Sequence, residues 1–302
     1  MILVCIVLVF LILFLGLCWW MAGYVMTGSR QTLEEAFDWQ KDHYDTSFFE
    51  PLEKTEYTIE GHDGYVLHAL FLKNPSPSDK YMIISHGYTD NRMGDLKYVK
   101  IYLDYGFNCV LYDLRGHGKN APTCTTYGIY EAKDLCKVIK DTRKRYSDIA
   151  VLGIHGESLG AATSITALKY KPDIDFVVAD CGFSDIENVL RGAYKSRKMP
   201  EWFFVIGDIG ARMRFHLSLR DMRPIDSLPG NTVPILFIHG AEDDFIVPKN
   251  SEDMKNATSG YAEFYTIPGA GHALSVIAGP DAYREHVGKF LNRILESIVK
   301  KV

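Results

Sequence analysis

The sequence has little that points to nucleic acid, to a metal or to a repeat architecture. Its 302 residues carry 33 Lys and Arg against 38 Asp and Glu, a net charge of −5, so no basic surface for nucleic acid is indicated. The six cysteines never show C-x-x-C spacing, and we interpret them as free, mostly buried thiols rather than metal ligands or a disulfide framework. Internal repeats and low-complexity tracts are missing as well. The remaining composition, 47% hydrophobic and 24% charged, is that of a globular protein with one large α/β domain.

Charged residues are missing from residues 2–26, which are almost wholly aliphatic and aromatic. About 25 helical residues at about 1.5 Å each can cross a hydrocarbon core of about 30 Å, and Trp19, Trp20 and Tyr24 suit the membrane interface. We expect residues 1–27 to be an uncleaved transmembrane anchor, with a cleaved signal peptide as the alternative, although a basic amino-terminal region is lacking. The rest of the chain is then expected outside the cytoplasm, or secreted in the alternative case.

After a polar linker over residues 28–52, apolar runs with the period of strands alternate with runs that have the period of helices. Strands alternating with helices predict a mostly parallel sheet with helices on both faces, here over residues 53–302. The expected strands are 53–60, 65–72, 81–85, 107–112, 151–155, 174–179, 233–239 and 262–267. The expected helices are 92–105, 128–146, 161–168, a segment after Pro248, and 281–300.

The chain turns sharply at Gly156-Glu-Ser-Leu-Gly160, between an apolar strand and a helix. A serine at such a turn holds its Oγ clear of the sheet, and the flanking glycines avoid clashes with neighbouring backbone. The helix behind it adds N–H groups and partial positive charge, which a nucleophile that attacks a carbonyl requires. Ser158 is therefore the candidate nucleophile, because this strand–turn–helix context is what distinguishes the motif from a chance occurrence.

A serine nucleophile in this architecture is followed along the chain by an acid and then by a histidine. Asp243 follows the penultimate strand and His272 follows the last one, so both lie at the sheet edge that Ser158 occupies. We expect His272 to take the Ser158 proton and Asp243 to orient the imidazole. If the position of the acid is counted back from Pro248, Asp244 is selected instead of Asp243. We count forward from the end of the strand at 233–239, because the sheet fixes where that strand ends.

Two backbone N–H groups are expected to hold the oxyanion, those of Leu159, directly after the nucleophile, and of Tyr88, after the strand at 81–85. This chemistry requires neither a metal nor another cofactor. Four other histidines lie at strand ends or near the elbow and are interpreted as structural: His86, His117, His155 and His239.

Residues 183–230 interrupt the alternation, and no strand is evident there. About 48 residues between two core strands exceed a plain connection. The insertion carries amphipathic stretches at 185–194 and 201–215, and we expect it to form a helical lid that shapes an apolar pocket. Packing on the core alone is the alternative.

Together these motifs resemble the α/β-hydrolase superfamily, from about Tyr57 to the carboxyl terminus. The chain is most similar to bacterial membrane-anchored or exported serine hydrolases of the esterase and lipase type. The resemblance implies an eight-stranded, mostly parallel sheet with a helical lid after the sixth strand. The matching motifs are Ser85-His-Gly87, Asp113-Leu-Arg-Gly-His-Gly118, Gly156-Glu-Ser-Leu-Gly160, His239-Gly-Ala-Glu-Asp243 and Gly269-Ala-Gly-His272.

The expected function is the hydrolysis of small-molecule carboxylic esters through an acyl-enzyme, at a membrane and without nucleic acid. A serine peptidase on short peptides uses the same triad and is an alternative. A catalytically inactive binding protein on the same fold is another, because a fold alone does not establish an activity. Dehalogenases and epoxide hydrolases need a carboxylate at the elbow, and Ser158 argues against both.

Overall fold

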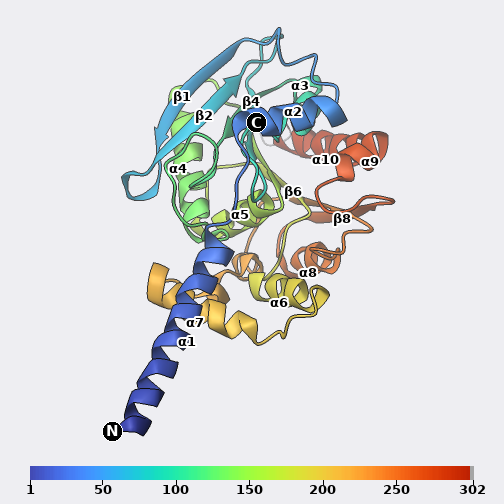
Figure 1. The fold of residues 1–302 in the computed structure, drawn as a ribbon. Helices are drawn as coiled ribbons and strands as arrows, with labels where there is room; N and C mark the ends of the chain where they lie inside the picture. The colour runs from blue at the N-terminus through green and yellow to red at the C-terminus, as the bar shows by residue number, and fades with distance from the viewer. Residues whose placement is uncertain (300–302) are drawn as a thin grey trace.

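The computed structural model describes residues 1–299, in which helices cover both faces of an eight-stranded sheet and one long helix projects from the body (Figure 1). Residues 300–302, the end of the expected last helix and domain, lie outside the described residues. The strands are β1 (Lys54–Glu60), β2 (Val66–Leu72), β3 (Lys80–Ser85), β4 (Phe107–Tyr112), β5 (Val151–Glu157), β6 (Phe176–Asp180), β7 (Ile235–Gly240) and β8 (Ala262–Ile267). The α-helices are α1 (Ile2–Met26), α2 (Leu33–His43), α3 (Leu96–Asp104), α4 (Ile129–Arg145), α5 (Leu159–Ala167), α6 (Ile186–Ser196), α7 (Phe203–Phe215), α8 (Lys249–Ala257), α9 (Ser275–Ala278) and α10 (Pro280–Val299).

The strand order is β1-β2-β4-β3-β5-β6-β7-β8. Strand β2 runs antiparallel to both of its neighbours, and from β4 to β8 every neighbouring pair is parallel. The expected α/β-hydrolase fold, with its mostly parallel eight-stranded sheet, is thereby confirmed. The carboxyl ends of β5, β7 and β8 lie along one edge, so the loops that follow them can share a site.

Alternating side chains of β3 face the two helical layers. Tyr81 and Ile83 pack in one apolar cluster with Leu135 of α4, whereas Met82 and Ile84 pack in another with α3 and α10. Both faces of the strand are therefore buried, which explains its continuous apolar run in the sequence. Helices α4, α5 and α8 cover the first face, and α3 and α10 cover the second.

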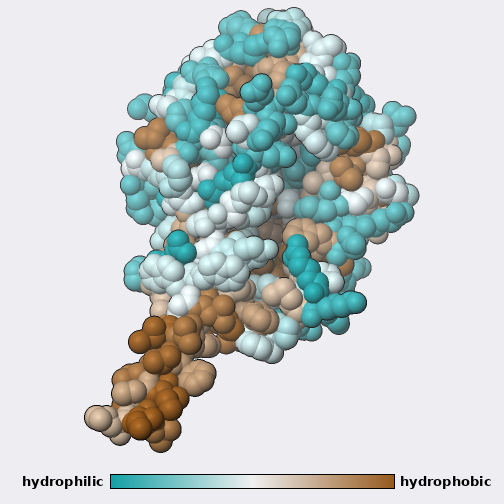
Figure 2. All heavy atoms as spheres, in the orientation of Figure 1, coloured by the Kyte–Doolittle hydropathy of each residue, from teal (hydrophilic) through white to brown (hydrophobic). Residues whose placement is uncertain are grey.

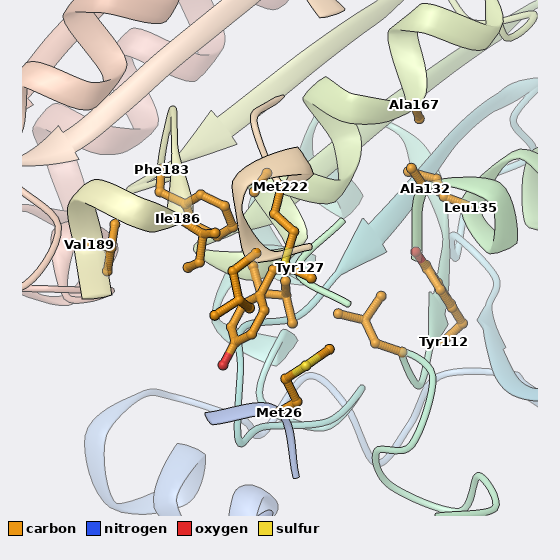
Figure 3. Close-up of a cluster of buried hydrophobic side chains, with 14 of the residues drawn as sticks. Met26, Tyr112, Tyr127, Ala132, Leu135, Ala167, Phe183, Ile186, Val189 and Met222 are labelled. Atoms are coloured by element: carbon orange, nitrogen blue, oxygen red, sulfur yellow. The ribbon is translucent and has the colours of Figure 1, made fainter. Parts of the chain in front are cut away.

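The insertion between β6 and β7 forms α6, α7 and two 3-10 turns (Leu219–Asp221 and Pro224–Ser227), and α7 lies along α1. The two helices approach closely at Gly210, where a Cβ would lie 1.8 Å from the carbonyl oxygen of Cys18. Met26, the last residue of α1, is fully buried and lies beside the apolar cluster that contains Tyr127 (Figure 3).

Helix α1 therefore has two parts. Residues 1–17 are almost entirely exposed and protrude as an apolar rod (Figure 2), whereas the last turns, from Cys18 onward, contact the body. Within the described residues, α1 is the single helix that is long and apolar enough to cross a membrane. The expected anchor is thus continuous with the folded domain.

The segment expected as a linker, residues 28–52, is also part of the packed body. Helix α2 begins with a capping box formed by Thr32 and Glu35. Gln40 is fully buried; its side chain donates to the carbonyl oxygen of Gly94 (2.8 Å) and accepts from the N–H of Lys97 (3.0 Å). These bonds fix α2 against the start of α3.

Helix α3 begins at Leu96, four residues later than the pattern indicates. Arg92 is buried, and its Nη1 lies 2.5 Å from the carboxylate of Asp113. A buried ion pair of this kind fixes Arg92 in a turn ahead of the helix, and hydropathy periodicity does not reveal it.

Candidate active site

Ser158 occupies a strained turn between β5 and α5. Its backbone has φ +51° and ψ −110°, and its N–H donates to the carbonyl oxygen of Asp180 (2.8 Å). A Cβ at Gly160 would lie 1.8 Å from the carbonyl oxygen of Ser85, and one at Gly156 would lie 2.3 Å from the backbone of Gly160. Only glycine fits at these two positions, so the turn can lie directly against β3.

A hydrogen-bonded chain links the three residues that the sequence indicates. Ser158 Oγ lies 3.0 Å from His272 Nε2, and His272 Nδ1 lies 2.7 Å from Asp243 Oδ2. If Nδ1–H donates to the carboxylate, Nε2 is free to accept the serine proton. The arrangement thus has the order of groups, and permits the tautomer, that a nucleophile, a base and an orienting acid require.

Asp243 is held by more than His272. Its Oδ1 accepts from the N–H groups of Phe245 (3.0 Å) and Ile246 (2.9 Å), and its Oδ2 lies 3.2 Å from His239 Nε2. Burial raises the pKa of Asp243, but hydrogen bonds from His239 and His272 outweigh it and hold the pKa well below its ordinary value. The carboxylate is therefore ionised near neutral pH.

The neighbouring Asp244 has a different environment. Its side chain is exposed, and within the described residues it makes no hydrogen bond, whereas Asp243 is 3% exposed and contacts His272. The geometry therefore brings Asp243 and not Asp244 to the imidazole.

The backbone N–H groups of Tyr88 and Leu159 are the candidates for binding an oxyanion. Leu159 is the first residue of α5, where the N–H has no partner inside the helix. The N–H of Tyr88 donates to no acceptor within residues 1–299. Tyr88, Leu159 and Ser158 all line the same cavity. The assignment of these two N–H groups to the oxyanion therefore stays a prediction.

Three of the other histidines are buried and hydrogen-bonded within the fold. His86 accepts from the N–H of Leu114 (2.8 Å), and His155 Nδ1 lies 2.8 Å from the hydroxyl of Tyr102. Burial lowers the pKa to about 3 for both His86 and His155, and to about 2 for His117. All three are neutral near pH 7 and occupy structural positions. His239 is also buried, but it contacts Asp243 directly.

A buried ion pair beneath Ser158 was missed by the sequence reasoning. Lys97 Nζ lies 2.5 Å from Glu157 Oε2, and it also donates to the carbonyl oxygen of Ala273 (3.1 Å), next to His272. Tyr98 OH donates to the same Glu157 carboxylate (2.5 Å). This network joins the serine turn to the histidine loop. Glu157 is visible in the motif, but a lysine on a helix ordinarily indicates an exposed position.

The larger of two cavities at Ser158 has a volume of about 780 Å³. It lies between the end of α1 and α6, and most of its walls are aromatic or aliphatic. Its lining includes Trp19, Trp20, Tyr24, Val25, Tyr127, Phe183, Ile186, Val189, Leu190 and Tyr194.

The smaller cavity, of about 240 Å³, is also lined by Ser158 and is more polar. His272, Lys97 and Asp90 line it together with residues of α2. Burial, followed by the repulsion of Glu157, raises the pKa of Asp90 to about 6. Ser158 is thus at the junction of an apolar cavity and a polar one.

Residues 94–297 match the prolyl oligopeptidase family. The chain belongs to this family. The uncharacterized protein YqkD of Bacillus subtilis is a relative that is 33% identical to this chain. The alignment covers 82% of this chain and 83% of YqkD. The uncharacterized protein YfhR of Escherichia coli K12 is 24% identical over 79% of this chain and 80% of YfhR.

Solved structures with a similar fold include an esterase and a protein solved with ferulic acid. The Pyrococcus furiosus esterase Pf2001 is 24% identical, with a TM-score of 0.66 over 84% of this chain and 95% of that one. Est1E of Butyrivibrio proteoclasticus, solved with ferulic acid, is 18% identical, with a TM-score of 0.64. The match covers 80% of this chain and 99% of the Est1E chain. At these identities the likeness shows the fold alone, an α/β-hydrolase fold.

Proposed function

We propose that the protein is a membrane-anchored serine hydrolase that cleaves carboxylic esters through an acyl-enzyme. The observation that carries the proposal is the hydrogen-bonded chain from Ser158 Oγ through His272 to Asp243, at 3.0 and 2.7 Å. Its position at the inner end of an apolar cavity of about 780 Å³ supports an acyl group as the ligand.

In the first half of the reaction, Ser158 Oγ attacks the ester carbonyl carbon while His272 Nε2 takes the hydroxyl proton. The carbonyl oxygen becomes an oxyanion, which the N–H groups of Tyr88 and Leu159 stabilise. Collapse of this intermediate breaks the bond to the alcohol oxygen, which leaves with the proton from His272. Asp243 stabilises the imidazolium ion without itself becoming protonated.

In the second half, water replaces the alcohol. His272 takes a proton from the water, whose oxygen attacks the acyl carbon of the Ser158 ester. The second oxyanion is held by the same two N–H groups. When it collapses, Ser158 Oγ regains the proton from His272 and the carboxylic acid leaves.

Peptidase activity is the second candidate, because the family that the chain matches is named for oligopeptide cleavage. The lining of the larger cavity favours esters. None of the described residues that line it is Asp or Glu, whereas binding a peptide amino terminus there would need a carboxylate. A panel of p-nitrophenyl esters of graded chain length, compared with aminoacyl amides, separates the two. Higher kcat/KM on the amides would favour the peptidase.

A fluorophosphonate probe tests the serine chemistry against a catalytically inactive binding protein. The folded protein should be labelled, Ser158→Ala should not be, and Ser196→Ala, an exposed control, should be labelled as wild type is. Ser158→Ala and His272→Ala should each lower ester turnover by several orders of magnitude. Retention of more than about a tenth of the activity by either would refute the assignment.

Helix α1 is proposed to anchor the protein without being cleaved. Its last turns support this, because Thr125 N–H donates to the carbonyl oxygen of Met26 (2.8 Å) and Tyr127 OH donates to that of Val25. Cleavage near the end of the helix would remove these contacts. The resemblance to exported hydrolases supports an extracytoplasmic catalytic domain.

Alkaline carbonate extraction of membranes tests the anchor. The wild-type protein should stay in the membrane, and a Leu8→Arg, Leu11→Arg variant should be released, because each Arg near the centre of a span costs about 2.5–3.5 kcal/mol. Both positions lie in the exposed part of α1, so the packed turns are unchanged. Release of the wild type, or a mature amino terminus beyond Met26, would refute the anchor. Protease accessibility of the catalytic domain in intact spheroplasts tests on which side of the membrane the domain lies.

A further inference from the structure

One wall of the larger cavity is the apolar helix itself. Trp19, Trp20 and Tyr24 of α1 line this cavity together with Ser158, and α6 supplies the opposite wall. The rise of a helix puts about 9 Å between Trp19 and Val25, which also lines the cavity. The cavity therefore runs along the last turns of α1 towards the nucleophile.

The exposed part of α1 fixes where a bilayer would lie. Residues 1–17 extend over about 25 Å, close to the thickness of a hydrocarbon core. Trp19, Trp20 and Tyr24 follow and are 49%, 59% and 62% exposed, as aromatic residues at a membrane interface are. The outer end of the cavity is thus at the level where the hydrocarbon ends.

The neighbouring surface of the body has the same character. Trp202, Val205 and Met213, in and just before α7, are exposed apolar side chains. Figure 2 shows apolar surface continuing from α1 onto this part of the body. Arg214 donates to the carbonyl oxygen of Trp19 (3.3 Å) and lies over its ring, a position typical of a cation at the interface.

The two cavities divide a bound ester between them. His272 donates its proton to the leaving alcohol, so the alcohol must lie on the side of His272, which lines the polar cavity. The acyl chain then extends to the other side, into the apolar cavity and towards α1. In this orientation the far end of the acyl chain lies at the level of the bilayer.

We propose that the substrate is a long-chain acyl ester of a membrane lipid, which reaches Ser158 sideways from the bilayer, between α1 and α6. The inference rests on the proposed serine-hydrolase function and names its substrate class. Most residues that line the cavity are aromatic or aliphatic, although Arg197 and Arg214 line it too, so the acyl chain stays in a largely apolar environment from the hydrocarbon to the nucleophile. A long-chain ester taken up from solution has the same chemistry, and the experiment below separates uptake from solution from entry out of the bilayer.

The test uses the full-length protein reconstituted in phosphatidylcholine vesicles that contain dioleoylglycerol or dioleoyl phosphatidylglycerol. Release of oleate is measured when the ester is in the same vesicles as the protein and when it is in separate vesicles. We expect release to be at least ten-fold faster from the same vesicles. Equal rates in the two formats would overturn entry from the bilayer.

Failure of this inference is distinguishable from failure of the proposed function. Protein that hydrolyses p-nitrophenyl acetate and is labelled by fluorophosphonate, but releases oleate from neither lipid in any format, overturns the lipid substrate alone. Protein that is neither labelled nor active on p-nitrophenyl acetate overturns the serine-hydrolase function and the inference with it.

Two adjacent positions on α6 provide a matched pair of variants. Ala193 lines the cavity, whereas Gly192 is exposed, and a Cβ added there would have no heavy atom within 4 Å. Ala193→Trp should fill the cavity and lower the ratio of lipid to p-nitrophenyl acetate turnover at least ten-fold. Gly192→Trp should leave both rates within two-fold of wild type. The same ratio for Ala193→Trp as for wild type would overturn the assignment of this cavity to the acyl chain.

Discussion

His239 and Asp243 are in direct contact: His239 Nε2 lies 3.2 Å from the carboxylate oxygen of Asp243 that also accepts from His272. The other ring nitrogen of His239 is 2.7 Å from Ser251 Oγ. The same Nε2 is 2.6 Å from the carbonyl oxygen of Ile246, so the ring is fixed at both ends. His239 is thus a positioning residue for the proposed acid, four residues before it in the chain.

The first prediction concerns this contact. His239→Phe should lower kcat for ester hydrolysis about 10-fold with little change in KM, because a hydrogen bond to a charged group contributes about 1.5–3 kcal/mol and part of it acts in the transition state. His239→Gln keeps an N–H donor at the position of Nε2 and should remain within about three-fold of wild type. Equal kcat values for the two variants would contradict the positioning role.

The second prediction separates the two adjacent aspartates. Asp243→Asn should leave the fold intact but lower turnover by up to about ten-thousand-fold, because the amide favours the wrong imidazole tautomer. Asp244→Asn should be nearly normal, since that side chain is exposed. Steady-state kinetics and circular dichroism of both variants measure this. An inactive Asp244→Asn beside an active Asp243→Asn would reverse the assignment.

The third prediction concerns pH and stability. Burial lowers the pKa of His155 to about 3, whereas in the unfolded chain it is about 6.5. Between these values the unfolded state binds one more proton at His155, so this residue makes stability rise with pH and fall as pH drops from about 6.5 towards 3. The His155→Phe variant keeps an aromatic ring beside Tyr98 but removes the group that binds this proton.

Urea unfolding of detergent-solubilised protein at pH 4.5 and 5.5 measures the effect. The increase in unfolding free energy over this interval should be smaller in His155→Phe than in wild type, by about 1.4 kcal/mol. If the unfolding free energy increases by the same amount in His155→Phe as in wild type, His155 does not titrate as its burial indicates. The comparison between variants cancels the contribution of the buried carboxyl groups of Asp90, Asp134 and Asp180, whose pKa values are raised to about 6 and which act in the opposite direction.

The fourth prediction compares two glycines. Gly160→Ala should lower the unfolding free energy by at least about 1–3 kcal/mol, the usual cost of overpacking, because the new Cβ would lie 1.8 Å from the carbonyl oxygen of Ser85. Gly192→Ala, in open space on α6, should raise it by about 0.5–1 kcal/mol. Thermal unfolding measures both. Similar melting temperatures for the two variants would contradict the close packing of the turn.

The sequence predicted the sheet and the serine turn because both depend on local patterns. Buried strands give short apolar runs, and a strand–turn–helix with two glycines has few alternative structures. Periodicity carries no information about which residues from distant segments meet. The sequence therefore does not reveal the pairing of Lys97 with Glu157, and it indicates a structural role for His239 without revealing its contact with Asp243.

The same limit applies to α1 and to the insertion. The apolar run indicated a membrane span, but only the three-dimensional packing brings Trp19 and Trp20 beside the cavity at Ser158. The insertion of residues 183–230 was expected to cover the site, and α6 does line the cavity. Whether it moves as a lid stays a prediction, which hydrogen exchange of free and fluorophosphonate-bound protein tests.

The burial of the last turns of α1 has a consequence for kinetics. Cys18 and Met26 are fully buried, and Gly28 N–H donates to Tyr88 OH (3.0 Å), so no flexible tether separates the span from the nucleophile turn. If α1 spans the bilayer as proposed, Ser158 is held at one depth and one orientation relative to it. For a lipid ester the reaction becomes two-dimensional. Its rate should depend on the mole fraction of substrate in the membrane, and dilution of the vesicles at constant lipid composition should not change it.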